Sequence, residues 1–167
     1  MKYLAVLFLG VIVWGCQENL TEDSPFTGNE VVYSLQPGSV YAISGTVTFK
    51  ERKDGSTTVL VELKGTEGNL QLPVHLHLGD LTQADADVAA LLTPVIGKTG
   101  KSETHLVRLA DEQTITYREL TELEACIKIH LAETGPDRDI ILAAGNIGTA
   151  IQHAFGGRYE IAVCKSE

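Results

Sequence analysis

Apolar and polar residues alternate along much of the chain, and a period of two predicts β-strands with one buried face. The alternation is clearest over 70–78, where its apolar members are Leu70, Leu72, Val74, Leu76 and Leu78. The other face carries His75 and His77, whose Cα atoms would lie about 6.6 Å apart in a strand. Gly79 and Asp80 then predict a turn. We therefore expect a half-buried strand with two histidines pointing away from the core.

Similar patterns predict most of the remaining structure as strands. They are expected at 31–35, 40–51, 57–64, 105–109, 113–120, 125–131, 140–144 and 159–163. The Asp54-Gly55 step supplies the positive φ of a hairpin turn between two of them. Because tight turns join 40–51, 57–64 and 70–78, these three strands are expected to form an antiparallel meander.

One segment departs from alternation. Residues 81–92 place apolar side chains at helical spacing, begin near a capping-box-like Thr82-x-x-Asp85 and stop before Pro94, so they predict a short helix. Loops are expected at 97–103 and at the glycine-rich 145–148, and a helical turn at 149–155. About eight strands with one short helix predict an all-β fold, either a Greek-key β-barrel or a sandwich.

The N-terminus has the pattern of a bacterial lipoprotein. Residues 1–15 are a short positive start and an apolar run too short to span a bilayer, which indicates a signal peptide. Val13-Trp14-Gly15-Cys16 resembles a lipobox, with Cys16 as the lipidated residue; the alternative is an ordinary secretory signal. Residues 16–30 are expected to be a flexible tether and 31–167 the β domain. We expect a lipid anchor in the cell envelope, at the outer membrane because Gln17 does not favour inner-membrane retention.

Composition limits the classes of partner and reaction. The formal net charge is −9 and no basic patch is evident, which argues against nucleic-acid binding. The sequence contains no Gly-x-Ser-x-Gly, P-loop or dinucleotide fingerprint, so we assign no catalytic residue from motifs.

Two cysteines remain once Cys16 is assigned to lipid. Cys126 and Cys164 lie on the outward faces of their expected strands, and an envelope protein sits in an oxidising compartment. We expect a disulfide worth about 4 kcal/mol in the chain-entropy model. The alternative is a pair of unbonded thiols.

The histidines are the candidate metal ligands. His75 and His77 share a polar strand face, and His130 lies on the polar face of 125–131, a combination that suits copper or zinc. The alternative is a set of solvated surface histidines. His105 and His153 are weaker candidates, because one follows a charged loop and the other is expected in a helical turn.

The order of motifs resembles the Cu/Zn superoxide dismutase family and, equally, chordin-type (CHRD) domains. The resemblance covers about Val40 to Cys164 and is carried by Gly45-x-Val47-x-Phe49, Asp54-Gly55-Ser56, Val59-x-Val61-x-Leu63-x-Gly65, His75-Leu76-His77-x-Gly79-Asp80, Ile127-Lys128-Ile129-His130, Gly145-Asn146-Ile147-Gly148 and Ile161-Ala162-Val163. It implies that His75, His77 and His130 are copper ligands.

The sequence also departs from the dismutase pattern. No histidine lies between Asp80 and His105, Arg108 stands where a zinc aspartate is expected, and Ala150 stands near the position of the substrate-guiding arginine. We therefore expect no zinc site. The expected function is an envelope lipoprotein that binds copper at a reduced three-histidine site. The alternatives are a copper-dependent superoxide dismutase and a non-catalytic binding module on the same fold.

Overall fold

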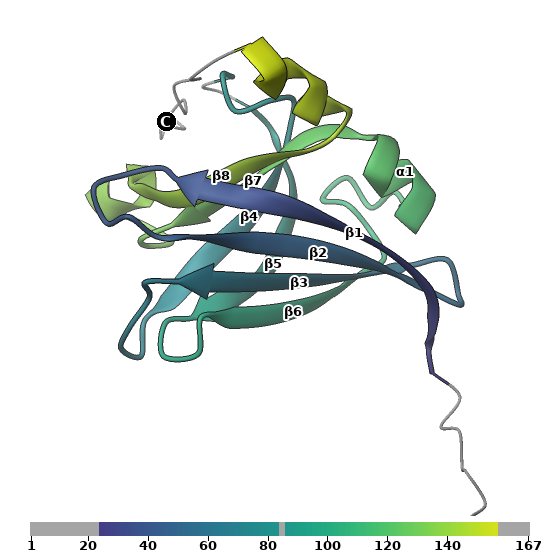
Figure 1. Ribbon diagram of the computed structural model, residues 1–167, viewed down its shortest axis with the longest axis horizontal. Helices are drawn as coiled ribbons and strands as arrows, with labels where there is room; N and C mark the ends of the chain where they lie inside the picture. The colour runs from purple at the N-terminus through teal and green to yellow at the C-terminus, as the bar shows by residue number, and fades with distance from the viewer. Residues whose placement is uncertain (1–23, 84–85, 157–167) are drawn as a thin grey trace, which may run out of the picture.

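Eight antiparallel strands form one closed barrel (Figure 1). The computed structural model describes residues 24–83 and 86–156. The elements are β1 (Phe26–Pro37), β2 (Ser44–Arg52), β3 (Thr57–Lys64), β4 (Gln71–Leu78), β5 (Val88–Ile96), β6 (Lys101–Leu106), α1 (Tyr117–Glu122), β7 (Glu124–His130), η1 (Pro136–Asp139), β8 (Ile141–Gly148) and η2 (Thr149–Gly156). The all-β barrel prediction is confirmed.

The strand order around the barrel is β1-β2-β3-β6-β5-β4-β7-β8. In Figure 1, β1, β2, β3 and β6 form a front layer, and β4, β5, β7 and β8 lie behind it. The predicted meander is therefore wrong after β3, because β3 pairs with β6 and β4 crosses to the other layer. This crossing gives the Greek-key arrangement, in which a returning strand lies beside an earlier one. It also makes β4 the neighbour of β7.

The barrel interior is filled by one face of each layer. Among the most buried contributors are Val47, Phe49, Val59, Val61, Val74, Leu76, Ile127 and Ile129, each at most 1% exposed. The Phe49 ring packs edge-on against Tyr33, with ring centroids 5.4 Å apart. Each large apolar side chain buried in this way contributes about 1.5–3 kcal/mol, so the alternation that predicts the strands also holds the layers together.

The helix predicted for 81–92 is wrong. Residues 88–96 form β5, which buries Ala89, Ala90 and Leu92 and leaves Leu91 66% exposed. Pro94 lies within this strand, at a register shift where Leu72 faces Val95 and Val74 faces Leu92. A proline is tolerated there because a bulge interrupts the ladder of hydrogen bonds. Asp85 of the expected capping box lies outside the described residues.

The short helix of this fold lies elsewhere, at α1, where a strand is expected over 113–120. A capping box starts it, because the Glu119 N–H donates to Thr116 Oγ1 and the Thr116 N–H donates to the Glu119 carboxylate. The preceding strand, β6, occupies 101–106, so it begins inside the expected 97–103 loop. Between β6 and α1, strand pairing is reduced to one bridge between Arg108 and Thr114.

The expected glycine-rich loop at 145–148 is the second half of β8. Gly145 lets β1 approach closely, since a Cβ there would collide with the carbonyl oxygen of Ser34. Gly148 ends the strand with φ +55°, a conformation that favours glycine. The expected helical turn follows as the 3₁₀ helix η2.

The two ends of the chain are only partly described. β1 begins at Phe26, which is earlier than the domain start expected at 31. The predicted signal peptide and the predicted strand at 159–163 lie outside the described residues. Within the described residues, no helix combines the length and apolar character that a membrane span requires.

Candidate metal centre

Two adjacent strands bring three histidines together. His75 and His77 project from β4 and His130 from the end of β7, and these strands pair with His77 opposite Cys126 and Val74 opposite Ile129. Each histidine offers one ring nitrogen, and these nitrogens all lie within 4.8 Å of one another. The spacing is close enough for one metal ion to contact all three.

The histidines face away from the barrel interior, as predicted, yet they are buried. His75 is 5% exposed, and His77 and His130 are each 1% exposed. Their cover comes from the connections that follow β4 and β7, which place Ala86 against His77 and Arg138 against His130. The polar face of these strands is therefore a covered site rather than a solvated surface.

Two backbone carbonyls determine which nitrogens are available to a metal. His77 Nδ1 lies 2.9 Å from the Ala86 oxygen, and His130 Nδ1 lies 2.7 Å from the Arg138 oxygen. Because a carbonyl can only accept a hydrogen bond, each Nδ1–H is the donor, and the lone pair of each ring is at Nε2. Donation of the second ring N–H to a carbonyl is the usual support of a metal-ligating histidine.

The Nε2 atoms themselves are without protein partners. Nε2 of His75, His77 and His130 is buried, and none of the three has a hydrogen-bond partner among the described residues. Buried polar atoms of this kind are rare, because leaving one unsatisfied costs about 1–3 kcal/mol. Three such atoms on histidines whose ring nitrogens lie within 4.8 Å of one another form a site with the donor atoms of a metal centre.

Burial also keeps these rings uncharged. Loss of solvent contact lowers the pKa of His75 to about 4, with smaller contributions from the neighbouring histidines and Arg138. Loss of solvent contact likewise lowers the pKa of His77 to about 4 and lowers that of His130, although each carbonyl bond opposes the shift. The imidazoles are therefore neutral at pH 7, the state that metal coordination requires.

The connection after β4 is fixed over the site by a polar and an apolar contact. The Leu81 N–H donates to Asn146 Oδ1 at 3.0 Å, and Asn146 Nδ2 donates to the Ala150 oxygen at 3.1 Å. The Leu81 side chain is fully buried, in a small cluster with Cys126, Ile141 and Ala144 outside the main core. Asn146 thus has a structural role that the Gly-Asn-x-Gly motif does not reveal by itself.

Three charged residues beside the site were not predicted. Lys128 lies on the same face of β7 as His130 and is fully buried. The Glu133 Oε2 atom lies 4.0 Å from His75 Nε2, and Arg138 acts electrostatically on all three histidines. Strand alternation could have indicated Lys128, because it shares one face of β7 with Cys126 and His130. Glu133 and Arg138 belong to a connection without periodicity.

Of the two weaker histidine candidates, His105 does not join the cluster. His105 is on β6, opposite Thr58, and is exposed. Its Nε2 lies 2.7 Å from Ser56 Oγ, which itself donates to Asp54 Oδ1, so the ring nitrogen donates to the hydroxyl. The side chain of His153 lies outside the described part of the chain.

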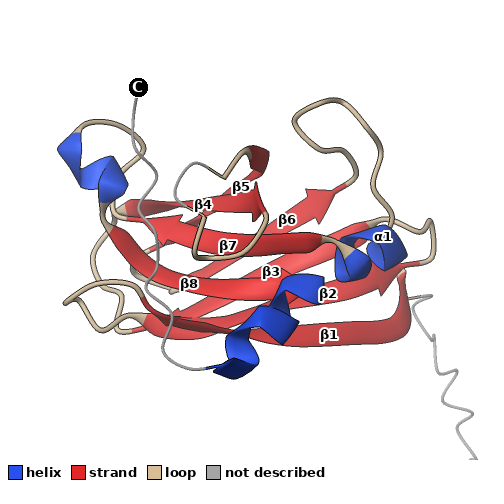
Figure 2. Ribbon diagram, turned by 90° about the horizontal axis from the view of Figure 1, so that it is seen from above, coloured by secondary structure: helices blue, strands red, loops and turns tan. Residues whose placement is uncertain are grey.

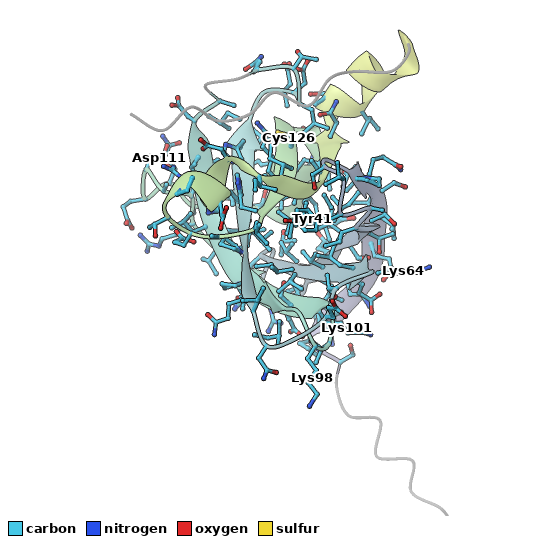
Figure 3. All side chains as sticks on the ribbon, turned by 90° about the vertical axis from the view of Figure 1, so that its left-hand side faces the viewer. Tyr41, Lys64, Lys98, Lys101, Asp111 and Cys126 are labelled. Carbon is cyan, nitrogen blue, oxygen red and sulfur yellow. The ribbon has the colours of Figure 1, made fainter. Side chains whose placement is uncertain are left out.

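The cysteine predictions are only partly addressed. Cys126 is fully buried, and Figure 3 shows it within the body of the molecule. Cys16 and Cys164 lie outside the described residues. The lipid attachment and the Cys126–Cys164 disulfide therefore stay predictions.

Comparison with known proteins adds no relative. No protein-family model matches the sequence, and no curated protein matches it either. The resemblance to dismutases and chordin-type domains stays a prediction, and the functional argument depends on the geometry of the three histidines.

Proposed function

We propose that this chain is a lipid-anchored protein of the bacterial cell envelope whose barrel binds one copper ion through His75, His77 and His130. The main support is the set of three buried histidines, whose Nε2 atoms lack hydrogen-bond partners among the described residues and which offer ring nitrogens within 4.8 Å of one another. The neutral state of the rings and the two carbonyl bonds at Nδ1 prepare the site for a cation.

Copper is the metal that this donor set favours. Neutral imidazole suits zinc, copper, iron and nickel, and copper has the highest affinity among the divalent ions of the first transition row. The resemblance to copper-binding dismutases is an independent argument, since it selects these three histidines from the five in the chain.

The envelope location is supported by the sequence alone. Its basis is the short apolar run that ends in Val13-Trp14-Gly15-Cys16, followed by a polar stretch before β1. A lipid on Cys16 would hold the barrel near a membrane surface without a spanning helix.

The metal content of the native protein tests the copper assignment. Protein purified from the cell envelope without chelators, after growth with both copper and zinc, is expected to contain one copper ion per chain. Elemental analysis by mass spectrometry measures this directly. Stoichiometric zinc, or no metal at all, would contradict the assignment of copper.

The anchor is tested by replacing its attachment atom. Cys16→Ser is expected to move the protein out of the membrane fraction, because serine cannot receive the thioether-linked lipid. Fractionation followed by immunoblotting measures the change, with Cys126→Ser as the control that should fractionate like the wild type. A Cys16→Ser protein that still sediments with membranes would refute the lipobox interpretation.

A further inference from the structure

The carboxylate of Glu133, in the connection between β7 and β8, lies beside the three histidines. Glu133 Oε2 is 4.0 Å from His75 Nε2, and the Glu133 side chain is 62% exposed. We propose that Glu133 is the fourth ligand of the metal site, an inference that rests on the proposed function. The site would then hold its ion with three imidazoles and one carboxylate from the connection between β7 and β8.

Glu133 Oε2 lies close to His75 Nε2, a buried atom that has no hydrogen-bond partner among the described residues. A separation of 4.0 Å is too long for a hydrogen bond. A cation between the carboxylate oxygen and the Nε2 lone pair would bring both atoms into coordination distance.

The charges around the site favour an anionic ligand. Arg138 and Lys128 place positive charge near the histidines. A metal cation is stabilised at close range by a carboxylate, and Glu133 places one 4.0 Å from His75 Nε2.

The backbone holds Glu133 near the site and leaves its side chain free to turn inward. His130 ends β7, and the Leu131 N–H donates to the Ile140 oxygen at 3.0 Å, which closes the connection at its base. Between them Pro136 starts η1, and the Arg138 carbonyl of that turn accepts from His130. Figure 2 shows η1 and its flanking loops at one end of the strands, beside β7 and β8.

Glu133→Gln tests the assignment, because it keeps the size of the side chain and removes the charge. With Cu(II) as the probe, the variant is expected to bind copper at least about tenfold more weakly, since even outer-shell partners of a metal typically contribute 10–100-fold. It should also open a coordination position. Azide is therefore expected to bind the copper-loaded variant at least about tenfold more tightly than the copper-loaded wild type, with a new azide-to-copper charge-transfer band.

Asp137→Asn is the matched control, because it removes one exposed carboxylate from the same connection. It should leave both the copper and the azide affinity at the wild-type values. A Glu133→Gln variant with wild-type azide affinity would overturn the ligand assignment, even if copper bound more weakly, because that pattern means Glu133 only orients His75. Copper binding by none of the proteins, wild type included, would overturn the proposed function itself.

Discussion

Replacing His77 with alanine is expected to weaken Cu(II) binding by more than about a hundredfold, because it removes a direct ligand whose loss should exceed the 10–100-fold cost of an outer-shell partner. The same loss is expected for His75→Ala and His130→Ala, since each of the three histidines offers one ring nitrogen within 4.8 Å of the others. Titration of metal-free protein with Cu(II) against a competing chelator of known affinity measures the change.

His105→Ala is the control for this series. His105 is exposed and bonded to Ser56, outside the cluster, so its replacement should leave copper affinity unchanged. Circular dichroism of each variant shows whether the barrel remains folded. Equal copper affinity in the wild type and all four variants would refute the three-histidine copper site.

A superoxide assay on the copper-loaded wild type should give slow or no turnover, since a net charge of −9 opposes capture of an anion.

The metal-free protein is expected to lose stability as the pH falls from 6.5 to 5. Burial lowers the pKa of His75 and of His77 from 6.5 to about 4 in the folded state. Above pH 6.5 both states hold neutral rings, so these groups do not alter the free energy of unfolding. Below it the unfolded chain gains protons that the folded chain excludes. The free energy of unfolding should therefore fall by about 1–2 kcal/mol for each of these histidines over this range.

Urea denaturation at pH 7.5, 6.5, 5.5 and 5 measures this dependence. His75→Gln is expected to flatten the slope, because one of the three buried rings with a lowered pKa is gone, whereas His105→Gln should keep the wild-type slope. Exposed carboxylates such as Asp54 and Glu62 have lowered pKa values and titrate below this window. A free energy of unfolding that stays constant from pH 7.5 to 5 would show that the three-histidine site is open to solvent.

The sequence predicts strands well where one face is apolar. The expected range 57–64 matches β3, and the 70–78 strand matches β4 to within one residue. Period two shows which side chains share a face, yet it does not identify the neighbouring strand. For that reason the pairing of β3 with β6 was not predicted, although the number of strands was.

Two segments were misassigned because a short apolar pattern fits both structures. Val88, Leu91 and Leu92 have helical spacing, but β5 buries the small Ala89 and Ala90 against the interior. In 113–120 the alternation suggested a strand, whereas the Thr116-x-x-Glu119 capping box starts α1. Local capping signals were decisive in the second case and could have been read from the sequence.

The sequence predicted which histidines lie together, and it did not predict what covers them. Strand alternation placed the histidines on one face, and the resemblance to dismutases brought β4 and β7 together. Their burial depends on connections without periodicity, such as the one that Leu81 fixes to Asn146, a residue 65 positions later in the chain. Contacts of this range leave no local signal.

The pairing of β4 with β7 also links metal affinity to closure of the barrel. His75 and His77 are neighbours in any conformation of the chain, whereas His130 joins them only after a long loop has closed, which costs entropy. An unfolded chain can therefore present two of these imidazoles to an ion at low entropic cost, whereas the native state presents all three. A metal that occupies the site would link β4 to β7. Its free energy of binding would add to the stability of the fold, minus the free energy with which the unfolded chain binds the same metal.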